Sequence, residues 1–212
     1  MANISATLRA QFGEIDIYLF DQLHRGRLAR GMGVLDAGCG HGRNLVYLLR
    51  EGFDVRGVDT SAEAIDTVRQ MAERLLPGID PERFQVEPVE RMSLGDASVD
   101  YVISSAVLHF ARNRAHWRAM VDEMWRVLAP GGVLFARLAT TIGQGKLKAI
   151  GTGGRFLLPD GSVRFLVDEP MLSECVTRLG ATWLDPLKTS VVHNMRSMAT
   201  WVIGKPGPAR EA

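Results

Sequence analysis

The chain has 212 residues, of which 46% are hydrophobic and 23% are charged, a composition that is typical of a folded domain and excludes a disordered or fibrous chain. Lys and Arg number 25 against 24 acidic residues, so the net charge of +1 argues against a nucleic-acid-binding surface. The two cysteines, Cys39 and Cys175, fit neither a disulfide framework nor a metal site. With no signal peptide or membrane-spanning stretch in the sequence, we expect a cytoplasmic protein without a metal.

Short apolar runs alternate with helical patterns along most of the chain, which is typical of a parallel sheet covered by helices. The first strand is predicted over 33–37, and a glycine-rich turn and a helix over 43–50 follow it. The later strands are expected over 55–58, 84–87, 99–105, 133–138, 182–192 and 197–203.

The helix boundaries carry their own signals. Thr60 and Glu63 form a capping box before the second helix, in which both side chains bond free backbone amides. Asn113 is expected to cap a third helix that runs to Leu128 and ends before Pro130. A last helix is predicted over 170–179, with Gly180 as its C-cap.

The segment 140–154 contains five glycines and two lysines without periodicity and is predicted to be a mobile loop. Two short strands, 156–158 and 163–166, are expected to form a hairpin around a Pro-Asp-Gly turn. We therefore expect one domain over 1–212, with a leading helical segment over 1–32 and an insertion over 140–167 on the substrate side. The apolar hairpin suggests a dimer contact, so a monomer or a homodimer is expected.

The glycine-rich turn indicates a nucleotide or nucleoside site. A dinucleotide fingerprint placed on Gly38 and Gly40 would need glycine at position 43, which is Arg43. A phosphate-binding loop around 140–147 lacks the required residues as well. The remaining pattern has Asp36 in the first strand and Asp59 after the second, where a carboxylate matches the two hydroxyls of a ribose. The spacing therefore favours a nucleoside ligand.

The segment 34–44, which reads VLDAGCGHGRN, resembles motif I of the class I S-adenosylmethionine-dependent methyltransferases. Its Gly-Arg-Asn ending resembles the branch typified by tellurite-resistance methyltransferases. Similar motifs lie at 58–61, 100–106 and 126–132, so that the resemblance covers 33–138. It implies an α/β, Rossmann-like fold with a seven-stranded, mostly parallel sheet, an antiparallel last strand, helices on both faces and a small hairpin insertion.

The resemblance also implies the cofactor S-adenosylmethionine, the product S-adenosylhomocysteine and a set of binding residues. Gly38 and Gly40 would let the backbone approach the methionine part, Asp36 would bind its amino group, and Asp59 would bind the ribose. The full set is Tyr18, Asp36, Gly38, Cys39, Gly40, Arg43, Asn44, Asp59, Thr60, Ser61, Val89, Glu90 and Ser104.

Several members of this set have more specific expected positions. Thr60 and Ser61 would border the adenine, which the backbone of Val89 and Glu90 would read. Ser104 and Ser105 would lie near the sulfonium at the end of the fourth strand. Tyr18, in the leading segment, would close over the cofactor.

The expected reaction is in-line methyl transfer to a small-molecule acceptor, without nucleic acid or membrane partners. A hydroxyl or amine acceptor would need a base, for which His109 is the candidate, although a loop histidine more often packs locally. One alternative is a protein or RNA methyltransferase, which should show a basic face or an Asn/Asp-Pro-Pro-Tyr tetrapeptide. Another is a cofactor-binding module without turnover, and a nicotinamide oxidoreductase is more distant.

Overall fold

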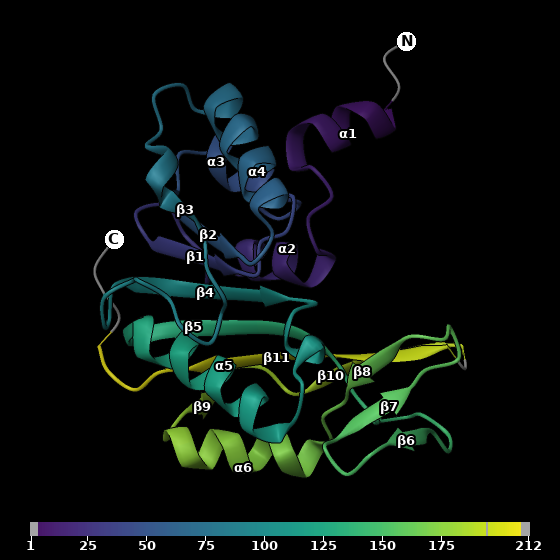
Figure 1. Cartoon of the computed structure of the whole chain (residues 1–212). Helices are drawn as coiled ribbons and strands as arrows, with labels where there is room; N and C mark the ends of the chain where they lie inside the picture. The colour runs from purple at the N-terminus through teal and green to yellow at the C-terminus, as the bar shows by residue number, and fades with distance from the viewer. Residues whose placement is uncertain (1–3, 194, 209–212) are drawn as a thin grey trace.

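The computed structural model describes residues 4–193 and 195–208 and is built around one large sheet (Figure 1). The strands follow the order β10-β11-β5-β4-β1-β2-β3. Their bounds are β1 Gly33–Ala37, β2 Asp54–Asp59, β3 Phe84–Val86, β4 Val99–Ser105, β5 Leu128–Ala139, β10 Lys188–Val192 and β11 Arg196–Gly204. Strands β1 to β5 are parallel, and β11 is antiparallel to both β5 and β10, which confirms the predicted fold class. A short strand, β9 (Thr182–Trp183), also pairs with β11 and adds an eighth strand to the prediction.

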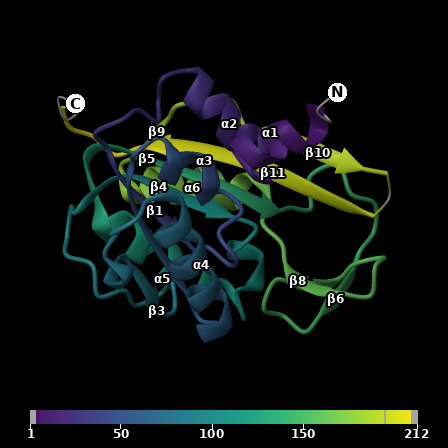
Figure 2. The same ribbon diagram turned by 90° about the horizontal axis from the view of Figure 1, so that it is seen from above.

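Helices cover both faces of the sheet, as predicted (Figures 1 and 2). The helix bounds are α1 Ile4–Phe12, α2 Ile17–His24, α3 Leu45–Arg50, α4 Ala62–Leu75, α5 Arg114–Val127 and α6 Glu169–Leu179, with short 3-10 turns η1 Pro81–Arg83 and η2 Leu108–Phe110. Buried residues of α2, α3 and α4 form one core cluster, and those of α5 and α6 form another on the opposite face. Among the residues described, no helix has the length and apolarity needed to cross a bilayer.

Strand β1 lies at the centre of the sheet between β2 and β4. All of its residues are buried, as expected for a parallel strand that is covered on both faces. The helix after β1 covers one face, whereas the helix after β4 covers the other. Because the chain leaves β1 toward one face and β4 toward the other, the two connections diverge and leave a crevice at the carboxyl ends of these strands. Ligands of open α/β sheets bind in such a crevice.

Three predicted helix boundaries are corrected. Helix α3 begins at Leu45 and not at position 43, because the preceding turn continues through Gly42 with a φ of +79°. Helix α4 is capped by Ser61, whose Oγ accepts from the Ala64 amide at 3.2 Å, so Thr60 is not the cap. Leu128 belongs to β5 and not to α5, since it pairs with Val99 of β4, and the backbone of 131–132 also pairs with Lys205. The predicted caps Asn113 and Gly180 are confirmed.

The insertion is larger than a hairpin. It is a separate three-stranded sheet of β6 (Lys148–Ile150), β7 (Arg155–Leu157) and β8 (Val163–Phe165), so part of the predicted loop is a strand. In both views it projects beyond one end of the main sheet, beside β10 (Figures 1 and 2). Leu158, Phe165 and Leu166 are buried within the chain, whereas Phe156, Leu157 and Val163 are half-buried, and the dimer contact stays a prediction.

The predicted strand over 182–192 is broken into β9 and β10. Pro186, which has no amide hydrogen to donate to a ladder, lies in the connection between them.

Candidate functional site

A cavity of about 860 Å³ opens at the carboxyl ends of β1, β2 and β4, where the crevice is expected. Most of the predicted cofactor residues line it. They are Gly38, Cys39, Gly40, Arg43, Asn44, Asp59, Thr60, Val89 and Glu90. Ser105, Ala106 and Val107 line it as well, so residues from four connections of the sheet meet at one site.

The turn after β1 is shaped by Gly38. Its φ is +83°, and a Cβ added there would lie 2.5 Å from Cγ2 of Val107. The amides of Gly38 and Cys39 both donate to the carbonyl oxygen of Val58, at 2.8 and 2.9 Å. The turn is thus fixed against the end of β2 and the connection after β4, and only glycine fits at position 38.

Asp59 is held at the edge of the cavity by two backbone amides. Its Oδ2 accepts from the Gly40 amide at 2.9 Å, and its Oδ1 accepts from the Ser61 amide at 2.9 Å. Each carboxylate oxygen has a second lone pair, so Asp59 can still accept from two hydroxyls of a ligand. Its orientation is set before any ligand arrives.

Asp36 is the unusual acid of the site. It is only 1% exposed, and neither carboxylate oxygen has a hydrogen-bond partner among the described residues. Burial raises the pKa of Asp36 to about 7, with a smaller contribution from the charge of Asp59, while Arg43 and Asn44 oppose the rise. Ionising a buried carboxyl group that has no hydrogen-bond partner costs free energy. A cation or hydrogen-bond donor of a ligand would lower this cost.

A chain of polar contacts joins the end of β4 to the leading segment. Arg43 Nη2 donates to Ser105 Oγ at 2.7 Å, and Ser105 Oγ donates to Asp16 Oδ2 at 3.3 Å. The Asp16 amide donates in turn to Asn44 Oδ1 at 3.0 Å. Next to Ser105, Ala106 has a φ of +65°, a strained conformation for a residue with a Cβ, and it also lines the cavity.

The far side of the cavity carries an acid–histidine pair. Glu90 contacts His116 Nε2 at 2.8 Å and forms an ion pair with Arg112 at 3.5 Å. Burial raises the pKa of Glu90, but its backbone hydrogen bond, His116 and Arg112 together hold it below its ordinary value. The Glu90 side chain is therefore charged and occupied by protein groups.

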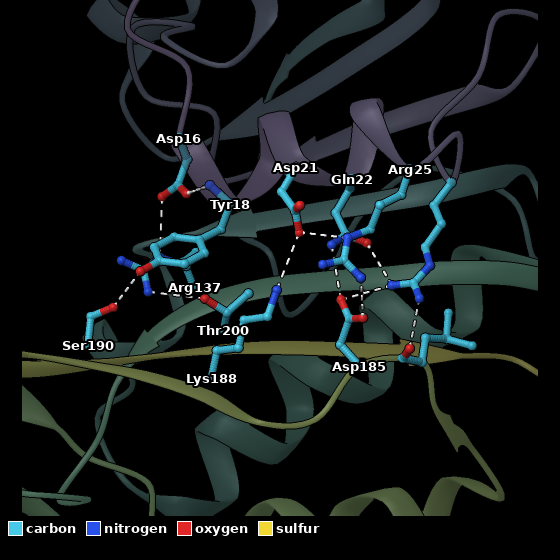
Figure 3. A network of polar contacts seen from close by, with 12 residues as sticks. Asp16, Tyr18, Asp21, Gln22, Arg25, Arg137, Asp185, Lys188, Ser190 and Thr200 are labelled. Atoms are coloured by element: carbon cyan, nitrogen blue, oxygen red, sulfur yellow. Dashed lines mark hydrogen bonds and ion pairs between the residues drawn. The ribbon is translucent and has the colours of Figure 1, made fainter.

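Four predicted cofactor residues do not line this cavity: Asp36, which is buried in β1 just before the turn, and Ser61, Ser104 and Tyr18. Ser61 caps α4, and Ser104 is fully buried on the strand face opposite to Ser105, with its Oγ unpartnered. Tyr18 points away toward β10 (Figure 3), where its hydroxyl shares a 2.6 Å hydrogen bond with Ser190 Oγ. The guanidinium of Arg137 lies 4.3 Å from the Tyr18 ring centroid.

A second cavity of about 350 Å³ adjoins the first and shares Arg43 and Ala106 with it. His109, the candidate base, lines this second cavity. Burial, together with the charge of Arg164, lowers the pKa of His109 to about 4, so the ring is neutral at pH 7. Its Nδ1 has no partner among the described residues.

Sequence reasoning missed two residues that organise the site, Asp16 and Arg137. For each of them, the sequence contains a pattern that could have identified it. Asp16 precedes an apolar helical run and is the N-cap of α2, accepting from the Tyr18 amide. Arg137 is a single charged residue within an otherwise apolar strand pattern, which is typical of a functional or paired position. In the part of the chain that the structure describes, no cluster of His, Cys, Asp and Glu could hold a metal ion.

Comparisons with known proteins agree with this geometry. Residues 35–136 match a family model described as a methyltransferase domain. A malonyl-[acyl-carrier protein] O-methyltransferase from Pectobacterium atrosepticum is 30% identical over 75% of this chain and 68% of its own length. A tRNA 5-carboxymethoxyuridine methyltransferase from Escherichia coli is 33% identical over 48% of this chain and 38% of its own length.

Among solved structures, a SAM-dependent methyltransferase from Methanosarcina mazei superposes with a TM-score of 0.70 at 23% identity, covering 87% of this chain and 97% of that chain. This likeness concerns the fold. The names of the two sequence relatives give acceptors of different kinds, a malonyl acyl-carrier protein and a tRNA 5-carboxymethoxyuridine.

Proposed function

Because the chain belongs to the class I S-adenosylmethionine-dependent methyltransferases, we propose that it transfers the methyl group of that cofactor to a small-molecule acceptor. The observation that carries the proposal is the first cavity, which the glycine turn and Asp59 line at the strand ends, with the buried Asp36 in the strand just before that turn. We further propose that 1–212 form one methyltransferase domain, in which the leading segment and the insertion shape the acceptor side. The tellurite-resistance branch, the cytoplasmic location and the oligomeric state stay predictions from the sequence.

The residues of the first cavity suit the cofactor. The turn at Gly38 lets the backbone approach the methionine part, and the unpartnered carboxyl group of Asp36 lies in the strand just before this turn. Asp59 has its remaining lone pairs for the ribose hydroxyls. Thr60, Val89 and Glu90 border the space that would take the adenine.

When bound, S-adenosylmethionine supplies an electrophilic methyl group, so that the electron pair of the acceptor forms the new bond while the pair of the broken carbon–sulfur bond stays on sulfur. The chain's own residues therefore have to bind, orient and exclude water, not to activate the donor. The contacts among Arg43, Ser105 and Asp16 fix the wall between the two cavities. A carboxylate or thiolate acceptor needs no base, whereas His109 is neutral at pH 7 and able to accept a proton from a hydroxyl.

Calorimetry with S-adenosylmethionine and S-adenosylhomocysteine tests the proposal. We expect Asp59→Ala to weaken binding at least tenfold, or about 1.4 kcal/mol, because the ribose loses its acceptor. Asp54→Ala is the matched control, since Asp54 lies at the opposite end of β2 and pairs with Arg83. It should change the affinity less than twofold. Failure of the unaltered protein to bind either compound at high micromolar concentration would end the proposal.

A small-molecule acceptor is supported by the size of the second cavity, about 350 Å³, which suits a compact ligand. Incubation with methyl-labelled cofactor and fractionated cell extract tests this part. Label should enter the low-molecular-mass fraction. Label in RNA or protein alone would reject a small-molecule acceptor and would leave the methyltransferase assignment standing.

A further inference from the structure

The second cavity lies between the carboxyl ends of β4 and β5 and the turn that joins β7 to β8, with β10 and β11 along its side. It shares Arg43 and Ala106 with the first cavity, so the two cavities adjoin at these residues. In-line transfer requires two sites that adjoin in this way, because the reacting atoms must approach to about 3 to 3.5 Å.

More positively than negatively charged side chains line the second cavity. Four arginines line it, whereas its carboxylates are those of two aspartates. The arginines are Arg43, Arg137, Arg164 and Arg196, and the aspartates are Asp16 and Asp160. Asp160 lies in an exposed turn and accepts from the Ser162 amide at 2.9 Å. The cavity therefore has an excess of positive charge.

Two of these arginines have no carboxylate partner within ion-pair distance among the described residues. Arg164 donates to the neighbouring carbonyl of Val163 at 3.0 Å and lies 4.8 Å from the ring centroid of Phe110. Arg196, on β11, is exposed and makes no side-chain hydrogen bond with the described residues that line the cavity. Both arginines lie near enough to Asp160 to help lower the pKa of its carboxyl group, but neither forms an ion pair with it, so both guanidinium groups can bind a ligand anion.

Arg137 is held in place, as Figure 3 shows. Its side chain is 12% exposed, its Nε lies 3.4 Å from Asp16 Oδ2, and its Nη1 donates to Thr200 Oγ1 at 3.2 Å. The Tyr18 ring packs against the guanidinium, and Ser190 holds the Tyr18 hydroxyl. These contacts use Nε and Nη1, which leaves Nη2 as a fixed donor for a ligand. This arrangement also gives Tyr18 a role on the acceptor side.

We propose that the second cavity binds the acceptor, and that the acceptor is a small molecule with a carboxylate or phosphate group that Arg137, Arg164 and Arg196 bind. The inference rests on the proposed function, since an acceptor is needed only if the first cavity holds the methyl donor. It adds the chemical class of the acceptor and the residues that select it.

The test is calorimetry on the protein saturated with S-adenosylhomocysteine, with succinate, inorganic phosphate and the neutral succinamide as probes. We expect at least one anion to bind and succinamide not to bind. The double variant Arg164→Gln/Arg196→Gln should weaken anion binding at least tenfold and leave S-adenosylhomocysteine affinity unchanged. Arg155→Gln is the matched control, because Arg155 lies in the same small sheet but does not line the cavity, and it should change anion affinity less than twofold.

A second readout is the pKa of His109, followed by NMR. A bound anion offsets the charge of Arg164, so succinate or phosphate should raise this pKa, and succinamide should not. Binding of succinate alone assigns a carboxylate as the anchoring group, and binding of phosphate alone assigns a phosphate.

Three results overturn the inference and leave the proposed function intact. They are equal binding of succinamide, anion binding that survives the double variant, and no anion binding by a protein that does bind S-adenosylhomocysteine. If the unaltered protein binds no S-adenosylhomocysteine, the proposed function fails, and this inference fails with it.

Discussion

Burial changes the ionisation of Asp36 strongly. Its carboxyl group keeps its proton up to about pH 7 in the folded chain, against an ordinary value of 3.8. The proton is retained because burial disfavours the charged carboxylate more than Arg43 and Asn44 stabilise it. An ammonium group nearby would favour the ionised form, so cofactor binding and deprotonation of Asp36 should be linked.

The first prediction concerns the stability of the ligand-free protein. Between pH 3.8 and about 7 the folded state binds more protons at Asp36 than the unfolded state, so this residue lowers stability as pH rises through that window. The loss should approach roughly 4 kcal/mol at most, since one pKa unit corresponds to about 1.4 kcal/mol. Asp36→Asn should abolish this contribution.

Urea unfolding of both proteins between pH 4 and 8 checks this prediction. His109 acts in the opposite sense, because its depressed pKa adds stability as pH rises from about 4 to 6.5. The difference between the two proteins isolates Asp36. Parallel stability curves for the unaltered protein and Asp36→Asn would contradict the account.

The second prediction concerns the turn glycines. Gly38→Ala should destabilise the fold by about 1–3 kcal/mol, because the new Cβ would overlap Val107 in a backbone conformation that disfavours it. Gly40→Ala is the control, since φ is also positive there, at +51°, but no atom lies within 4 Å of the added Cβ. It should cost about 1 kcal/mol from backbone strain alone. Equal losses, measured by denaturant unfolding, would show that Val107 does not constrain the turn.

At the scale of elements, α2 is bound to the end of the sheet through one buried acid. Asp185, whose side chain is 4% exposed, contacts Arg27 at 2.8 Å and Arg25 at 3.3 Å and accepts from Gln22 Nε2 at 3.1 Å (Figure 3). The same helix carries Tyr18 and begins at Asp16, which both contact the second cavity's Arg137. The contacts of Asp185 therefore fix α2 in place, and with it the two residues that contact Arg137.

The third prediction is that Asp185→Ala loosens the leading segment and costs about 2 kcal/mol, because charged hydrogen bonds are lost while the arginines can still reach water. Asp21→Ala on α2 is the control. Asp21 is 36% exposed and pairs with Arg25 and Lys188, so its loss should cost less than about 1 kcal/mol. Unfolding curves and limited trypsin digestion after Arg25 and Arg27 measure both effects. Digestion at equal rates in the two variants would contradict the assigned role of Asp185.

Sequence reasoning succeeded where one local pattern determines one element. Contiguous apolar residues and a glycine turn predicted β1 and its position, and Asn113 predicted the start of α5. It failed where tertiary pairing decides. The extension of β5 back to Leu128 depends on pairing with Val99 of β4, and β6 depends on pairing with β7 across a glycine-rich segment without a clear pattern.

The site shows the same division. Gly38, Gly40 and Asp59 belong to contiguous motifs, and the structure brings them to one cavity as expected. The prediction that Tyr18 closes over the cofactor rested on the family resemblance of the leading segment. Its observed position depends on contacts with Ser190 and Arg137, which are remote in sequence. The sequence could not show which of Ser104 and Ser105 lines the cavity. Adjacent strand residues face opposite sides of the sheet, and β4 is buried on both.

At the scale of the whole molecule, the sheet supplies the first cavity, and the leading segment, the insertion and the last hairpin complete the second. The two meet at Ala106, directly after β4. The cofactor part of the fold is thus built from contiguous strand–turn motifs, whereas the acceptor part is assembled from segments far apart in the chain. Acceptor choice can change through those segments without disturbing the sheet.

The fourth prediction follows from mass action. S-adenosylhomocysteine at a hundred times its dissociation constant should stabilise the folded protein by about 2.7 kcal/mol. At the same concentration, Asp59→Ala should gain at least about 1 kcal/mol less, since its affinity is lower. Thermal unfolding with and without the ligand measures this gain. Equal stabilisation of the two proteins would show that the ligand does not use Asp59.

The most direct test of the central claim is a crystal structure of the protein with S-adenosylhomocysteine. The account predicts the ligand in the first cavity, with its ribose hydroxyls on Asp59, its amino acid part at the Gly38 turn and its sulfur facing the second cavity at Ala106. A ligand bound elsewhere, or bound there with its sulfur turned away from Ala106, would contradict the account.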